Sequence, residues 1–303
     1  MRPAWSVVFL TTLTGAGQGL FLALFAAHAL LEGAPSRTFV VAGSTVAVAL
    51  AALGLFASFF HLGRPERAWR SAAMWRTSWL SREVIALPLF MASAAAYGVA
   101  TFLGSSAALM LGALAAACCL ALFYCTAMIY ACVKFLQEWA SPFTIANFFL
   151  MGCASGFTLA TALAGRFAPA SLLPFAIAAI ALTAAAFFTR IASLARNDRI
   201  RPRSTLQTAI GVPDAKIRQI SQGFTGGSFN TQEFFHGASP RAMERMPGLF
   251  LTLGFMAPMV IIGVGVSANS FAVLLLAFAV QYAGLVLERW FFLAQSNHPQ
   301  NLY

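Results

Sequence analysis

Charged residues are scarce in this chain. Asp, Glu, Lys and Arg make up 9% of its 303 residues, whereas a soluble domain usually carries about 25%. Hydrophobic residues, in contrast, make up 60%. So few charges exclude a soluble globular enzyme, and the long apolar runs exclude a disordered or fibrous chain. The composition is therefore typical of a polytopic membrane protein.

Cysteine and histidine are also few, with five and four copies. Cysteines spaced along one straight apolar helix fit neither a disulfide framework nor a metal cluster. His28 ends the first predicted span and His61 ends the second, on opposite sides of the membrane, so the bilayer thickness separates them. We therefore expect no haem and no metal in this chain. The clustered cysteines are Cys118, Cys119, Cys125 and Cys132.

Uncharged runs predict the membrane spans directly, since the bilayer core takes roughly 20 apolar residues per helix. Strand-like alternation is absent, so only helices can satisfy the backbone in lipid. We expect an all-α bundle forming one membrane domain over 1–303, with extramembrane loops at about 62–81 and 191–246. The eight predicted spans are 5–31, 38–61, 82–103, 106–133, 143–164, 169–190, 248–266 and 271–292.

The distribution of positive charge predicts the orientation. An even number of spans puts both termini on one side, and this side receives 17 of the 19 Lys and Arg residues. Only Arg37 and Arg166 fall on the other side. Positive loops stay inside, so we expect cytoplasmic termini in a bacterial inner membrane, and lipid rather than nucleic acid as the partner of the excess charge. All six Trp fall on the basic side too, which suits either a one-sided lipid belt or a partner-binding face.

The first span contains a pair of small residues at helical spacing. Gly15 and Gly19 lie four residues apart, the spacing that lets two membrane helices approach closely. Gln18 lies between them and is the one long polar side chain of this span. It can serve helix packing, which the glycines favour, or reach a quinone or a chain of water molecules.

The segment 58–83 carries the polar chemistry of the chain. His61 lies where the second span meets the basic surface, and Ser81 is predicted to cap the third span with Arg82 and Glu83 in its first turn. A turn after one span and a cap before the next put these groups at a similar depth. We therefore expect them to form a pocket at the membrane surface.

A quinone headgroup matches these side chains. Its two carbonyls accept hydrogen bonds, and its reduction takes up two protons. His61 can donate a hydrogen bond and exchange protons near neutral pH. Arg64 or Arg82 can stabilise negative charge on the headgroup, and Glu83 can pass protons to the cytoplasm. The alternative from spacing alone is interfacial anchoring, with snorkelling arginines and a solvated histidine.

The same residues resemble the signature of the dimethyl sulfoxide reductase membrane anchor family. Eight spans fit this family, so the resemblance covers essentially the whole chain. It implies a haem-free quinone-binding anchor on which an iron–sulfur subunit and a molybdopterin catalytic subunit dock at the cytoplasmic face, with the signature histidine at His61. The matching segments are His61-Leu62-Gly63-Arg64-Pro65-Glu66-Arg67-Ala68 and Ser78-Trp79-Leu80-Ser81-Arg82-Glu83.

The segment 221–230 resembles a loop of the subgroup that contains anchors of cytoplasmic sulfite dehydrogenases. With a cytoplasmic docking face, this resemblance favours sulfite oxidation coupled to quinone reduction. The alternative within the family is an anchor that oxidises menaquinol for dimethyl sulfoxide or polysulfide reduction. A transporter, the alternative of another class, would place polar groups at the midplane. We also expect aromatic residues of the loop 191–246 to anchor the docked partner, namely Phe224, Phe229, Phe234 and Phe235.

Overall fold

The computed structural model describes residues 2–30, 35–201, 205–212, 216–218, 220 and 236–297. The described residues form helices and contain no strand. Eight helical segments among them are long and apolar enough to cross a membrane. The predicted all-α architecture with eight spans is confirmed. The segment 221–230 lies outside the described residues, and so do Phe224, Phe229, Phe234 and Phe235.

The observed helices follow the predicted spans closely. Short helical turns connect some of them, namely η1 (Phe59–His61), η2 (Pro65–Ala72), η3 (Pro169–Ser171) and α7 (Leu206–Ile210). The seventh span is composite, because α9 continues through one π-helical segment, η5, into α10. The long elements are α1 (Trp5–Leu30), α2 (Arg37–Ser58), α3 (Trp79–Phe102), α4 (Ala108–Ala131), α5 (Pro142–Phe167), α6 (Leu172–Asn197), α9 (Pro240–Leu251), η5 (Thr252–Met256), α10 (Ala257–Ser267) and α11 (Phe271–Ala294).

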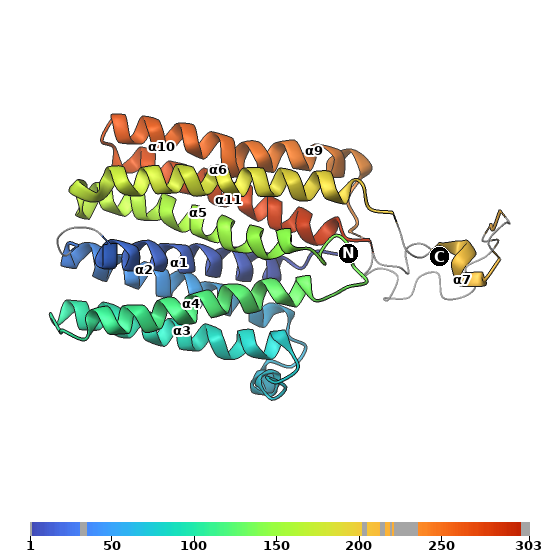
Figure 1. The fold of residues 1–303 in the computed structure, drawn as a ribbon, viewed down its shortest axis with the longest axis horizontal. Coiled ribbons are helices and arrows are strands. Elements are labelled where there is room, and N and C mark those ends of the chain that lie inside the picture. Colours follow the sequence, from blue (N-terminus) through green and yellow to red (C-terminus); the bar gives the residue numbers. More distant parts are fainter. Residues whose placement is uncertain are drawn as a thin grey trace.

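Helices α1 and α5 form the centre of the bundle. In Figure 1 they run between the α3–α4 pair on one edge and α6, α9 and α10 on the other. In their most apolar windows 72% and 78% of residues are buried, against at most 44% in the other spans. The start of α1 and the end of α11 lie at the same end of the bundle (Figure 1). Polar side chains on α1 therefore face protein rather than lipid.

Glycines bring α1 and α5 into backbone contact. A Cβ atom on Gly19 would lie 2.0 Å from the carbonyl oxygen of Gly152, and one on Gly156 would lie 2.1 Å from the backbone of Gly19. Gly15 also faces Gly152, at 3.6 Å. The packing predicted for the glycines of α1 is confirmed, and α5 supplies a matching pair at the same spacing.

Adding a methyl group at this crossing should destabilise the bundle. In Gly156→Ala the new Cβ would meet backbone, so α1 and α5 must separate; we expect a loss of about 1–3 kcal/mol in the free energy of unfolding. The thermal midpoint in detergent measures the loss. Gly263→Ala on α10 is the control, because its Cβ would meet nothing within 4 Å. Equal midpoints for the two variants would contradict the close crossing.

Two helices extend further than their uncharged runs predict. Helix α6 continues to Asn197 and α9 begins at Pro240, both inside the segment 191–246 that is predicted as loop. For α6 the reason is that a charged residue lies within the bundle rather than at its boundary. Arg190 Nε is 2.8 Å from Glu288 Oε1, and both side chains are almost fully buried. A paired charge can stay inside a helical span, so the first charge does not mark its end.

The cap of α3 also differs from the prediction. Ser78, not Ser81, has the extended backbone of an N-cap residue, and its hydroxyl accepts the backbone N–H of Ser81. The helix therefore begins one turn earlier, at Trp79. As a result Ser81 and Glu83 lie within α3 and are buried, rather than exposed at its first turn.

Candidate functional site

His61 lies on the surface of the bundle at the end of η1. Its side chain is exposed, and its Nδ1 atom is 3.2 Å from the hydroxyl of Ser6 near the start of α1. Among the described residues its other ring nitrogen has no hydrogen-bond partner. Exposed Phe56 and Phe60 precede it on the same stretch of chain. The imidazole is thus oriented by α1 and open to a ligand that arrives from the lipid side.

The following residues 64–78, here called the Trp–Arg segment, form an exposed surface of paired side chains. The guanidinium carbon of Arg70 lies 5.5 Å from the ring centre of Trp69, and that of Arg76 lies 5.3 Å from the ring centre of Trp75. Arg64 precedes η2 and is exposed too. Such cation–π pairs present positive charge and apolar area together.

Hydrogen bonds from Arg82 on α3 hold the Trp–Arg segment in place. Its Nε donates to the carbonyl of Trp75 at 2.9 Å, and its terminal nitrogen donates to that of Arg76 at 2.8 Å. The same guanidinium stacks 4.1 Å from the ring centre of Trp79. Because these contacts use its donors, Arg64 is the more open of the two predicted arginines.

Glu83 points into the bundle. Its side chain is buried, and the hydroxyl of Thr126 on α4 donates to its Oε1 atom at 2.5 Å. Ser81, two residues earlier in α3, is buried too. The structure thus divides the five predicted site residues: His61 and Arg64 are open at the surface, Arg82 holds the loop, and Ser81 and Glu83 lie inside.

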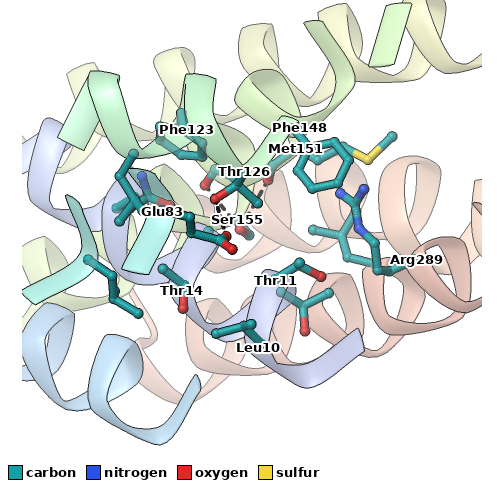
Figure 2. Close-up of a pocket in the computed structure, with 17 residues that line it drawn as sticks. Leu10, Thr11, Thr14, Glu83, Phe123, Thr126, Phe148, Met151, Ser155 and Arg289 are labelled. Atoms are coloured by element: carbon teal, nitrogen blue, oxygen red, sulfur yellow. Dashed lines mark hydrogen bonds between the residues drawn. The ribbon is translucent and has the colours of Figure 1, made fainter. Parts of the chain in front are cut away.

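Glu83 faces a polar cavity between α1, α3, α4, α5 and α11 (Figure 2). The water-sized space within it is about 20 Å³, which is room for a water molecule. The polar residues that line the cavity are Thr11, Thr12, Thr14, Gln18, Glu83, Thr126, Ser155 and Arg289.

Most of these lining residues are missed by sequence reasoning. Glu83 and Gln18 are the exceptions. The Nε2 atom of Gln18 donates to the carbonyl of Cys119 at 2.9 Å, so this side chain serves helix packing. The signal for the others is the group of hydroxyl side chains at helical spacing on the first span, Thr11, Thr12 and Thr14. Arg289 carries no such signal, because an arginine near the end of a span also suits the interface.

Three buried charges lie at and beside the cavity. The guanidinium carbon of Arg289 lies 3.6 Å from the ring centre of Phe148 and 5.3 Å from that of Phe292. Glu288, next to it on α11, pairs with Arg190 of α6. Arg190 also contacts the Phe250 ring at 5.4 Å. This cluster carries two positive charges and one negative charge inside the bundle.

The other histidines and cysteines belong to separate environments. His28 lies at the opposite end of α1, where its Nδ1 is 3.0 Å from the hydroxyl of Tyr97. The five cysteines are free thiols. Among the described residues, no three His, Cys, Asp or Glu side chains gather as a metal site would require.

Tryptophans at the basic end are of two kinds. Trp5, Trp69 and Trp75 are more than half exposed. Trp139, in contrast, is buried and donates from its indole nitrogen to the carbonyl of Phe292 at 2.9 Å. Trp139 is therefore a core residue, and only the exposed indoles can form a lipid belt or a partner-binding face.

Comparison with known proteins identifies the family. Residues 1–294 match the family model of the DMSO reductase anchor subunit (DmsC). The chain is also 50% identical to a protein of Allochromatium vinosum that is named as a subunit of sulfite dehydrogenase, over an alignment of 320 positions that covers 100% of this chain and 98% of the relative. The match extends over all eight spans and includes the segment from His61 to Glu83. The chain therefore belongs to the family of DMSO reductase anchor subunits.

Proposed function

We propose that this chain is the quinone-reactive membrane anchor of a three-subunit molybdopterin and iron–sulfur oxidoreductase in the bacterial cytoplasmic membrane. One observation carries the proposal: in a chain of this family, an open imidazole, His61, lies beside exposed Phe56 and Phe60 and next to the Trp–Arg segment. One end of the bundle thus carries a group that can exchange protons, an exposed apolar surface and a positively charged surface.

The residues around His61 suit a quinone headgroup. The free ring nitrogen can donate a hydrogen bond to a quinone carbonyl, while Ser6 fixes the orientation of the ring. The exposed phenylalanines offer an apolar surface to the isoprenoid end. Arg64 adds positive charge near the carbonyls. A bound quinone supplies the carrier of two electrons and two protons between the bilayer and the docked subunits.

The Trp–Arg segment is the proposed docking surface of the iron–sulfur subunit, with the catalytic subunit beyond it. Electron transfer is short-ranged, so the nearest cluster must lie on the same side as His61. Arginines and exposed tryptophans are enriched at protein interfaces, and this segment holds both. Because most positive charge lies at this end, we propose that it faces the cytoplasm.

Sulfite is the proposed substrate of the catalytic subunit. The relative from A. vinosum is named as a subunit of sulfite dehydrogenase, and half of its aligned residues are identical here. In this direction electrons leave sulfite and reach quinone near His61. The family name favours the second candidate, reduction of dimethyl sulfoxide with electrons from menaquinol.

An assay of the purified complex distinguishes the two candidates. We expect sulfite to reduce a soluble quinone analogue, with little oxidation of a quinol by dimethyl sulfoxide. The chain should co-purify with two larger subunits that contain iron and molybdenum. Turnover in the second assay alone would reverse the assignment of direction and substrate. Purification of the chain alone, with no electron transfer, would contradict the anchor role itself.

A further inference from the structure

A groove lies between α2 and α3 on the surface of the bundle, in the half that is away from His61. The water-sized space within it is about 320 Å³, far more than in the cavity beside Glu83. It extends along about two turns of each helix, or about 10 Å. The residues that line it are Val41, Ser44, Thr45, Val48, Ala95, Gly98, Val99 and Phe102.

Small residues form the floor of the groove and larger ones form its walls. Ser44 and Gly98 are buried at the floor, where a Cβ atom on Gly98 would lie 3.0 Å from that of Ser44. Val99 and Phe102 are 58% and 62% exposed, so they stand at the outer rim. The Thr45 hydroxyl donates to a backbone carbonyl one turn earlier, at 2.8 Å. The groove therefore presents a mostly apolar surface.

The bilayer decides what can fill this groove. Both helices are long and apolar enough to cross a membrane, so the groove opens toward hydrocarbon rather than water. An apolar surface that nothing covers loses its dispersion contacts. A further helix, about 10 Å across, is too wide to enter between two helices that already meet at Ser44 and Gly98. An acyl chain is the narrow apolar group that a bilayer supplies.

Arg37 lies at the end of the groove that is nearer the membrane surface. It is the first residue of α2, one turn before Val41 and on the same face of the helix. A Cβ atom on Gly104 would lie 3.2 Å from its terminal nitrogen, so the guanidinium group extends toward the turn that follows Phe102. The side chain is exposed and has no hydrogen bond or ion pair with a described residue. Its N–H donors can therefore bind an anion.

The start of α2 favours an anion as well. Ser36 is the N-cap residue, but its hydroxyl accepts no backbone N–H of the helix, whereas Ser141 of α5 and Ser270 of α11 do. The first N–H groups of α2 thus lack a side-chain acceptor, and such groups attract negative charge. Guanidinium groups bind phosphate well. A phosphate group joined to an acyl chain matches both the charged end and the apolar length of the groove.

We propose that the groove between α2 and α3 binds one acyl chain of a membrane phospholipid and that Arg37 binds the phosphate group of this lipid. The lipid fills the gap between the two helices and stabilises their packing. The inference does not depend on the proposed quinone site, because that site lies at the other end of α2.

Native mass spectrometry of the purified complex tests the acyl-chain site. We expect one phospholipid to stay bound to the wild type in mild detergent. Ala95→Phe places a ring in the groove and should remove the lipid. Ala92→Phe is the matched control, since Ala92 is an exposed alanine on the same helix that does not line the groove. Retention in Ala95→Phe, or loss in both variants, would overturn the site. A bound mass equal to that of a quinone would replace the phospholipid by a quinone tail and also overturn it.

The phosphate contact has its own test. Phosphatidylglycerol added to the delipidated complex should raise the thermal midpoint, because it binds the folded state. In Arg37→Gln its dissociation constant should rise about tenfold, the effect of one lost hydrogen bond to a charged group. Arg166→Gln, which removes the other arginine predicted on this side, should bind the lipid like the wild type. Diacylglycerol, which lacks the phosphate, should give a smaller shift. Equal shifts with the two lipids, or unchanged affinity in Arg37→Gln, would overturn the contact.

Discussion

His61→Ala should lower quinone-coupled turnover at least about 100-fold, since a positioned group that exchanges protons contributes a factor of this size or more. The side chain is exposed, and its one hydrogen bond within the described residues joins it to Ser6, so its removal should leave the bundle folded. Sulfite oxidation with an artificial dye should stay unchanged, because the dye takes electrons from the docked subunits directly. The ratio of the two activities in the purified complex is the measurement.

His28→Ala is the matched control for this variant. It removes a histidine from the same bundle, but at the opposite end of α1, where the ring contacts Tyr97. We expect quinone coupling to survive there. His61→Gln separates two roles, since glutamine can donate a hydrogen bond but cannot exchange a proton. Undiminished quinone coupling in His61→Ala would remove this residue from the site.

Glu288→Gln should cost about 3–5 kcal/mol of unfolding free energy, because it leaves buried arginine without a negative partner. Arg190 Nε lies 2.8 Å from Glu288, and both Arg190 and Arg289 interact with its charge. All three residues are at most 5% exposed, so water cannot replace the lost carboxylate. The thermal midpoint of the purified complex and the amount of folded protein in membranes measure the effect.

Glu244→Gln provides a comparison at an exposed acidic residue on α9, and it should leave the midpoint nearly unchanged. A double variant tests the mechanism further. Replacing Arg190 by Met as well as Glu288 by Leu removes both charges of the pair, which is often close to neutral. The double variant should therefore be more stable than Glu288→Gln. If the single variant matches the wild type, the buried pair contributes nothing to stability.

The interior of the bundle shows where sequence reasoning stops. The sequence correctly places Glu83 near the start of the third span. The prediction that Ser81 caps this helix is wrong. Because Ser78 is the cap, the helix begins earlier and both residues turn inward. From its place near the end of the last span, Arg289 is predicted to lie at the basic surface of the bundle. Its contact with Phe148 instead places it inside the bundle, beside the cavity.

The sequence by itself determined what depends on local composition. Length and apolar content fix the number of spans, since each span must cross the same hydrocarbon thickness. The asymmetry of Lys and Arg predicts an orientation with the basic end in the cytoplasm, and this stays a prediction. The pair Gly15 and Gly19 predicts a close crossing because only small residues let two backbones meet, and the contact with Gly152 confirms it.

Only the tertiary structure decided which faces of the helices point inward. In a soluble protein a polar face identifies the outside of a helix, but a membrane helix is apolar toward lipid and toward its neighbours alike. The periodicity of hydropathy therefore carries little information about burial. That Glu83 and Arg289 line one cavity depends on how five helices pack. The packing of the bundle also makes a buried ion pair of Arg190 and Glu288.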